Sequence, residues 1–329
     1  MAESKSGLNI VAVGGGTGLA TLLSGLKQFV TGSSEPPEIA DLSAIVAVSD
    51  DGGSSGRLRD ELQMPPPGDI RNCMVALSED SHLLSRLFRH RFSGDGSLAG
   101  HNFGNLFLAA LSEITGDFAE AVRLSSEILA SKGHIYPATD SDVRIAAELT
   151  DGSVARGETN ISRVGNQIRR LFLEPEHCLP MPIALEAIKK ANVITVGPGS
   201  LYTSLLPPLL VKGVSQAIED SKAVKIFVCN LMTQPGETDG LTARRHLEIV
   251  REYTRLEFDF LVVNSQPITA RQSELYQTEG AEQIGVHGSI EDKTVEGASV
   301  LRADLLSDGD MVRHDPLRLA RTVLSCASY

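Results

Sequence analysis

Two glycine-rich segments follow short apolar runs, and their chemistry is typical of phosphate binding. GGGTG separates LNIVAV from the amphipathic segment LATLLSGLKQFV, and GPGS follows NVITV. Where such a turn opens a helix, its backbone N–H groups and the helix dipole favour an anion. Together the two turns suit a diphosphate or two phosphoryl groups, whereas glycines needed only for helix–sheet packing are the competing interpretation. The predicted phosphate contacts are Gly14, Gly15, Gly16, Thr17, Gly18, Gly197, Gly199 and Ser200.

Two adjacent carboxylates, Asp50 and Asp51, follow the apolar run 42–48 and precede the flexible sequence GGSSGR. In an open α/β sheet, ligands bind outside the carboxyl ends of the strands. One or two carboxylates beside a phosphate are the usual protein ligands of Mg²⁺, so Asp50 and Asp51 are candidate metal ligands. An Asp-Gly turn in which one of them caps the next helix explains the same letters, and both interpretations stay open.

Arginine and amide side chains lie close to these carboxylates in the sequence. Arg57 ends the Gly/Ser segment, and Arg71 and Asn72 follow the proline-rich PPPGDI. An arginine presents a fork of donors to phosphate, and Asn72 suits a base or a sugar. A proline-initiated helix with an acidic first turn gives the same pattern without a ligand.

Motifs that would assign a reaction are missing from the sequence. It holds neither an HExxH nor a Walker A pattern, and GGGTG does not have the GxGxxG spacing of a dinucleotide site. We therefore expect no tightly bound organic cofactor, apart from the Mg²⁺ considered above. No residue is predicted to be catalytic, and binding is favoured over catalysis.

Composition excludes several classes of protein. The net charge of -12 disfavours nucleic acid and anionic membranes as partners. The four cysteines are scattered without metal-site spacing, which favours a reducing compartment. The N-terminal sequence lacks the features of a signal peptide, and no apolar stretch approaches the roughly 18 residues of a membrane span. We expect a cytoplasmic protein without membrane insertion.

Alternation of apolar runs with helical periodicity predicts an α/β fold. Five apolar runs are typical of strands buried in a parallel sheet: 8–13, 42–48, 193–196, 224–229 and 260–263. The pattern over residues 68–130 is typical of consecutive helices. This favours a Rossmann-like, doubly wound, mainly parallel sheet. Frequent turn signals, including Asp151-Gly152, predict a small β-rich insertion at 133–176. The nucleotide-binding core then comprises 1–132 and 177–329.

Six segments in order resemble one known family over nearly the whole chain. GGGTGLATLL, VSDDGGSSGRLRDEL, PPPGDIRNCMVAL, GHNFGN, VGPGSLYTS and NLMTQPGETDG are similar to the YvcK-type gluconeogenesis factors, which are related to the CofD-like 2-phospho-L-lactate transferases. The resemblance implies a Rossmann-like fold, a cytoplasmic location and binding of UDP-sugars such as UDP-N-acetylglucosamine. It also implies a role in cell shape and in the supply of envelope precursors during gluconeogenic growth.

The resemblance also points to two residues far along the chain. Tyr276 in SELYQTEG and Arg313 in VRHD match the nucleotide-sugar contacts of the family. A helix-surface residue and a solvated charge before the Asp315-Pro316 helix start are the alternative interpretations.

Two functions remain to be distinguished. The first is a regulatory protein that binds a UDP-sugar and acts on an unidentified protein partner, either alone or as a homo-oligomer. The second is a Mg²⁺-dependent transferase of the 2-phospho-L-lactate transferase type, with Asp50 and Asp51 at the metal and Arg57 or Arg71 stabilising the transferred charge. The chain departs from the transferases after the Asp pair, where it continues GGSSGRLR, and it has no Trp to stack on a deazaflavin.

Overall fold

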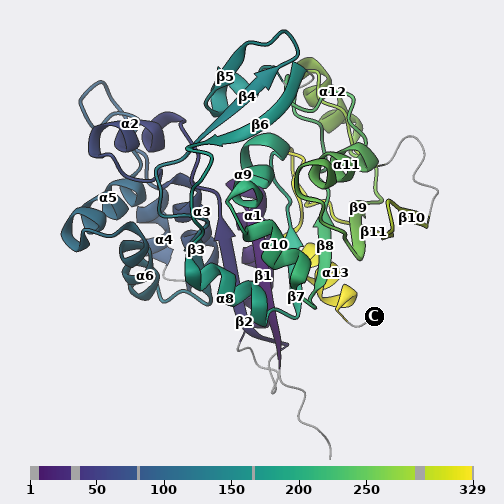
Figure 1. The fold of residues 1–329 in the computed structure, drawn as a ribbon, viewed down its shortest axis with the longest axis horizontal. Helices are drawn as coiled ribbons and strands as arrows, with labels where there is room; N and C mark the ends of the chain where they lie inside the picture. The colour runs from purple at the N-terminus through teal and green to yellow at the C-terminus, as the bar shows by residue number, and fades with distance from the viewer. Residues whose placement is uncertain (1–6, 31–37, 80–81, 165–166, 286–292, 328–329) are drawn as a thin grey trace, which may run out of the picture.

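An eight-stranded sheet runs through the centre of the molecule (Figure 1). The computed structural model describes residues 7–30, 38–79, 82–164, 167–285 and 293–327. In spatial order the strands are β10 (Thr294–Val295), β11 (Ala298–Ala303), β9 (Phe260–Asn264), β8 (Val224–Val228), β7 (Val193–Val196), β1 (Leu8–Gly14), β2 (Ile39–Val46) and β3 (His134–Pro137).

Parallel pairing joins the sheet from β3 to β11, and β10 pairs antiparallel with β11. The central strands are continuous apolar runs because helices cover both of their faces; Val11, Val13 and Ile194 are at most 2% exposed. The predicted doubly wound, Rossmann-like α/β fold is confirmed.

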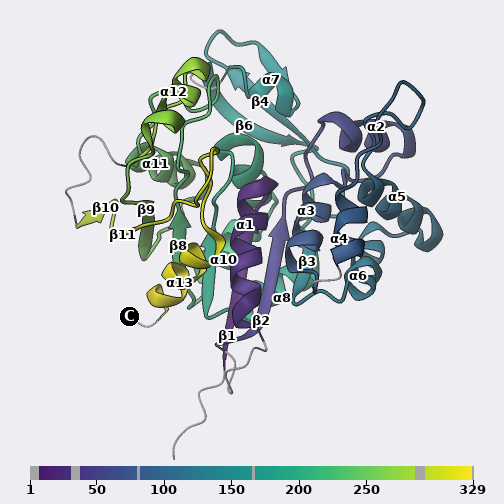
Figure 2. The ribbon, with the colours of Figure 1, turned by 180° about the vertical axis from the view of Figure 1, so that it is seen from behind.

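Helices cover the two faces of the sheet (Figures 1 and 2). On one face α1 (Gly16–Leu26) packs between α3 (Gly68–Leu77) and α13 (Pro316–Cys326). The other face carries α8 (Pro182–Lys190), α9 (Leu206–Leu210) and α10 (Val214–Asp220). The remaining larger helices are α2 (Gly53–Leu62), α4 (His82–Arg89), α5 (Phe103–Thr115), α6 (Phe118–Ile128), α11 (Ala243–Thr254) and α12 (Ala270–Glu279).

A second, antiparallel sheet of three strands lies beyond the carboxyl ends of the main strands, at the top of Figure 1. It consists of β5 (Val154–Arg156), β4 (Arg144–Leu149) and β6 (Ile168–Glu174), and α7 (Glu158–Ile161) follows β5. The buried guanidinium of Arg59 on α2 ties this sheet to the core. Its Nη2 donates to the Val143 carbonyl at 2.6 Å and contacts Asp142 at 2.5 Å.

The predicted insertion began too early in the sequence. The range 133–176 includes β3, which pairs with β2 at the edge of the main sheet through Ser43 and His134. The HIYP segment alternates between exposed and buried residues because it forms an edge strand. Its sequence pattern therefore resembles that of the small sheet that follows it. The small sheet itself starts only at Arg144.

The order of the strands reverses at β1. The chain passes from β1 outward to β2 and β3, and then returns to β7 on the other side of β1 before continuing through β8 and β9. Such a reversal leaves a crevice between the two neighbouring strand ends, where open α/β sheets bind ligands. GGGTG follows β1 and GPGS follows β7, so both turns lie at this switch point. Within the described ranges, we find no helix that combines the length and the apolar character of a membrane span.

Candidate functional site

The two glycine-rich turns are in contact. A Cβ atom added to Gly18 would lie only 2.4 Å from the backbone oxygen of Pro198. Gly16 has a φ of +65°, a conformation that side chains rarely adopt. Parallel pairing of Val13 with Val196 sets the ends of β1 and β7 side by side and so delivers both turns to one place. The predicted meeting of the turns is confirmed.

A pocket of about 350 Å³ opens beside this contact, and we call it the switch-point pocket. Its walls come from α1, from the loops after β7 and β8, from α12 and from the segment before α13. Six of the sequence-predicted residues line it: Thr17, Gly18, Gly199, Ser200, Tyr276 and Arg313. Gly14, Gly15, Gly16 and Gly197 are not among its lining residues.

The second turn has already paired its polar groups. The side chain of Asn230, at the end of β8, accepts from the Gly199 N–H at 3.0 Å and donates to the Gly199 carbonyl at 2.8 Å. Buried Glu237 accepts from the Ser200 hydroxyl at 2.5 Å and from the Tyr202 N–H at 2.9 Å. A carboxylate therefore occupies the place at this helix start where we expected phosphate, and GPGS shapes the pocket rather than offering it free amides.

The first turn keeps donors available. The carboxylate of Asp69 accepts from the Gly16 N–H, while Gly15 at the N-cap has no side chain that could cap α1. The first amides of a helix have no partner within the helix. Those of Thr17 and Gly18 belong to the part of α1 that lines the pocket. The start of α1 is thus the stronger candidate for an anion site of the two turns.

Tyr276 and Arg313 lie together on the wall of the pocket. The Tyr276 hydroxyl accepts from the Val312 N–H at 3.1 Å and so holds the backbone immediately before Arg313. Arg313 is exposed, with its charge at the pocket. Tyr276 therefore positions this segment, a role that its motif did not reveal, and its contact with a ligand stays a prediction.

A cluster of carboxylates lies on the other side of the first turn. Asp50, Asp69 and Glu158 interact electrostatically, and a Cβ on Gly15 would lie 2.5 Å from the Asp69 carboxylate. Burial, reinforced by the charge of Asp50, raises the pKa of Asp69 to about 7. Burial and the same neighbours raise the pKa of Glu158. Such mutual repulsion favours either protonation or a bound cation.

The Asp pair serves the backbone in part. Asp50 accepts from the Gly52 N–H at 2.8 Å, which is the turn that competed with the metal interpretation. Asp51 accepts from the Glu158 N–H at 3.1 Å and caps α7 rather than the next helix. Its Oδ1 is buried and has no hydrogen-bond partner among the residues that the structure describes. Hard oxygen donors and the unpartnered Oδ1 fit Mg²⁺. In the part of the chain that is described, however, no group of three or more such side chains has the arrangement of a metal site.

Three further predicted residues lie outside the switch-point pocket. Arg57 donates to the Ala99 carbonyl at 2.8 Å, and Arg71 donates to the Asn72 side chain at 2.7 Å. Asn72 in turn hydrogen bonds to Asp69. Arg71 and Asn72 therefore belong to the carboxylate cluster, whereas Arg57 is bound to the loop before α5. None of the three lines the pocket together with Gly199.

GGSSG has the GxSxG spacing of a nucleophile elbow, which the analysis of the sequence overlooked. Its central Ser54 lies 3.1 Å from His101 Nδ1, and the Asn102 N–H donates to the same hydroxyl at 3.2 Å. Ser54 and His101 are only 3% and 5% exposed, and neither lines the switch-point pocket. The pair connects α2 to the loop before α5.

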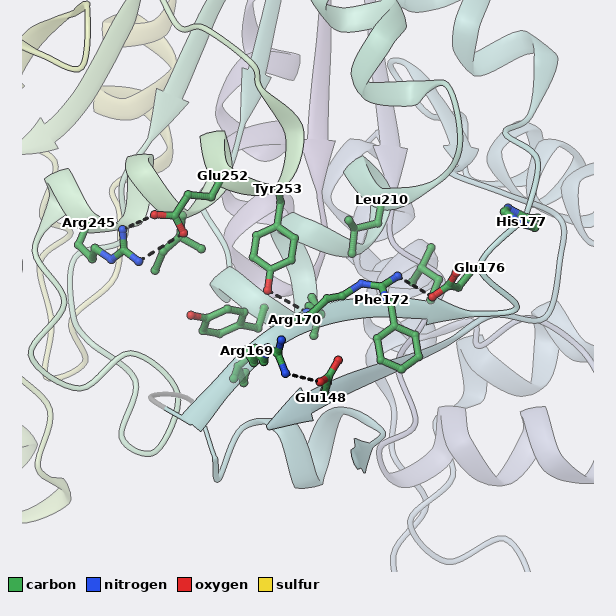
Figure 3. A pocket seen from close by; sticks show the side chains of 15 residues that line it. Glu148, Arg169, Arg170, Phe172, Glu176, His177, Leu210, Arg245, Glu252 and Tyr253 are labelled. Carbon is green, nitrogen blue, oxygen red and sulfur yellow. Dashed lines mark hydrogen bonds and ion pairs between the residues drawn. The ribbon is translucent and has the colours of Figure 1, made fainter. Parts of the chain in front are cut away.

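A larger groove, of about 800 Å³, lies between β6 and α11 (Figure 3). Its arginines are paired: Arg169 with Glu148 at 3.0 Å, Arg170 with Glu176 at 2.6 Å and Arg245 with Glu252 at 2.6 Å. The Tyr253 hydroxyl accepts from the Leu171 N–H. An anion entering this groove would compete with a carboxylate at each of these cations. The smaller switch-point pocket, which combines the start of α1 with Arg313, is therefore the better candidate site.

Asn230, Glu237 and His314 were missed as site residues. Each acts through a contact between loops that are distant in the sequence, and only the position of Asn230 directly after a strand carried a signal.

Comparisons with known proteins place these features in a family. The family model for 2-phospho-L-lactate transferase CofD matches residues 10–306. A gluconeogenesis factor from Halalkalibacterium halodurans is 43% identical over 96% of this chain and 95% of its own length, and one from Bacillus subtilis is 43% identical over 94% and 95%. A crystal structure of a Bacillus halodurans protein superposes with a TM-score of 0.89 at 42% identity, covering 97% of this chain and 99% of that one. The chain therefore belongs to the CofD family and, within it, resembles the gluconeogenesis factors.

Proposed function

We propose that this protein is a regulatory protein that binds a nucleotide sugar of the UDP-N-acetylglucosamine type in the switch-point pocket. One observation carries the proposal: the start of α1, Arg313 and Tyr276 face a single pocket at the strand-order reversal. The helix start and the guanidinium suit a diphosphate, and the aromatic ring suits the nucleoside. A volume of about 350 Å³ lies at the lower end of the range for small-ligand sites.

Regulation, rather than turnover, is favoured by the chemistry of the pocket wall. It presents hydroxyl, amide, phenol, imidazole and guanidinium groups and the carboxylate of Glu279. The carboxylate cluster lies on the other side of the α1 turn. Ligand binding would then be read by a protein partner or by a second copy of the chain, in the cytoplasm. The names of the relatives, gluconeogenesis factors, support a role in carbon supply, and supply of envelope precursors and cell shape are the outputs that we propose.

Calorimetric titration with UDP-N-acetylglucosamine tests the proposal. Arg313→Gln should weaken binding at least about tenfold, because a charged hydrogen bond to phosphate is lost. Arg169→Gln is the matched control, since it removes an exposed arginine from the larger groove of Figure 3. Wild-type protein that is folded but shows no binding at millimolar ligand would refute the proposal. Loss of binding in Arg169→Gln alone would move the site to the groove.

A second candidate function rests on the carboxylate cluster. A Mg²⁺-dependent transferase of the family's type would hold the metal at Asp50 and Asp51, and the metal would supply charge stabilisation for a transferred phosphoryl-linked group. The hydrogen bond from Arg71 to Asn72 keeps a cation beside Asp69, where transferred charge would develop. Incubation with labelled nucleotide donors and Mg²⁺ decides: turnover that is lost in Asp50→Asn supports this candidate, and no turnover in the wild type removes it.

A further inference from the structure

His314 is a buried side chain on the wall of the switch-point pocket. It directly follows Arg313 in the segment between β11 and α13, and it is 8% exposed. The chain has eight histidines, and no sequence motif assigns a function to this one. It lies between the predicted phosphate contact Arg313 and the cap of α13, and it belongs to the wall of the pocket.

One nitrogen of the His314 ring is satisfied and the other is not. The backbone carbonyl of Cys229, the last residue before Asn230, accepts a hydrogen bond from the ring. Nε2 is buried and has no hydrogen-bond partner among the described residues. An unpaired buried polar atom is costly, so such an atom beside a pocket is best explained by a partner that the ligand brings.

The protonation state of His314 fixes what that partner must be. Burial lowers the pKa of His314 to about 4, so the ring is neutral near pH 7. With the single proton placed on the nitrogen that donates to Cys229, Nε2 carries only a lone pair. Nε2 is therefore an acceptor, and it pairs with an N–H or an O–H.

A second acceptor supports the same requirement. The side-chain oxygen of Gln234, another lining residue of the pocket, is also buried without a partner in the described part of the chain. The side-chain oxygen and nitrogen of Asn230, also on this wall, are each hydrogen-bonded to Gly199. The wall near the end of β8 is thus rich in acceptors, in contrast to the donors at the start of α1.

We propose that His314 determines specificity in the switch-point pocket by accepting, at Nε2, a hydrogen bond from an N–H or O–H of the bound nucleoside. The inference rests on the proposed nucleotide-sugar function. The two parts of the ligand then meet different groups of the pocket. Thr17, Gly18 and Arg313 bind the phosphates, whereas His314 selects the nucleoside. A ligand that presents a methyl group or a lone pair to Nε2 leaves this acceptor unpaired and binds more weakly.

Two substitutions distinguish the contact of His314 Nε2 with the ligand from the hydrogen bond of the ring to the Cys229 carbonyl. His314→Asn keeps a donor near the Cys229 carbonyl but removes the acceptor at the position of Nε2. His314→Gln places an amide oxygen close to that position. The ligands are UDP and three UDP analogues that each lack one donor: N3-methyl, 2′-deoxy and 3′-deoxy. Titration calorimetry measures affinity, and thermal unfolding without ligand measures fold.

We expect His314→Asn to weaken UDP binding roughly tenfold to a hundredfold, as for a buried acceptor left unpaired, and His314→Gln to restore most of it. The analogue that lacks the donor to Nε2 should bind wild type and His314→Asn with equal affinity. The same analogue should bind the wild type more weakly than UDP does, and this comparison needs no variant. The proposal is overturned if His314→Asn binds UDP within twofold of wild type, or if it weakens UDP and all three analogues by one common factor. A wild type that binds none of the ligands refutes the proposed function instead.

Discussion

Gly18→Ala tests the contact on which the switch-point pocket depends. The added Cβ would lie 2.4 Å from the Pro198 oxygen and 2.7 Å from its carbonyl carbon. An ordinary C···O contact is about 3.3–3.6 Å, so the two turns must separate by roughly 1 Å. Overpacking of this kind costs about 1–3 kcal/mol, offset by up to about 1 kcal/mol because alanine favours the helix over glycine.

The same helix offers a matched control. In Gly25→Ala the new Cβ would lie 1.9 Å from another proline carbonyl, that of Pro316 on α13, at the other end of α1 from the pocket. Both variants should lose stability in urea unfolding, Gly25→Ala at least as much as Gly18→Ala. Titration with UDP-N-acetylglucosamine should show weaker binding only for Gly18→Ala. Equal affinities in all three proteins, or weaker binding in Gly25→Ala alone, would refute the claim that this contact shapes the site.

Three further changes probe the cluster, the insertion and the pocket wall. The pKa of Asp69 is higher in the folded than in the unfolded chain, so the folded state binds more protons and the Asp69 contribution to stability falls between about pH 4 and pH 7. Asp69→Asn should make the fall in stability shallower over this range and leave the part that Glu158 contributes, and parallel urea-unfolding profiles would contradict this. Arg59→Ala should cost about 2–4 kcal/mol of unfolding free energy, because it leaves a cavity at a buried position and removes the hydrogen bond to Val143. Arg59→Met should cost less, because its side chain fills most of that space. Equal losses of stability in the two variants would refute the packing argument. Tyr276→Phe should lose about 1 kcal/mol of stability with the Val312 bond and weaken UDP-sugar binding, and unchanged stability would remove that bond from the account.

The central part of the fold follows from local signals in the sequence. β1 and β7 are apolar on both faces, and a glycine-rich turn follows each of them. Each segment by itself therefore predicts a buried parallel strand with a ligand crevice at its carboxyl end. The dipeptide Asp315-Pro316 likewise predicted the start of α13, where Asp315 caps the helix by accepting from the Arg318 N–H at 2.7 Å. The edges were not: β11 mixes apolar and polar residues because it joins the sheet near its rim.

The residue pattern alone predicted the two glycine-rich turns of the site, and the family resemblance added Tyr276 and Arg313. That the first two turns meet follows from the switch-point rule once β1 and β7 are neighbours. Glu237, by contrast, fills the start of the second helix through hydrogen bonds to Ser200 and Tyr202, and no spacing encodes such a contact between separate loops. The diphosphate that we expected to be shared by both turns is therefore assigned mainly to α1 and Arg313.

The packing of α13 against α1 joins the two ends of the sequence in one structural unit. Gly18 emerges from the ribosome well before Tyr276 and Arg313, so the wall opposite α1 is still missing when α1 is synthesised. Domains tend to fold as units during translation. A nascent chain can thus contain β1, α1 and β2 long before the wall of the switch-point pocket is complete, because that wall requires the segment before α13.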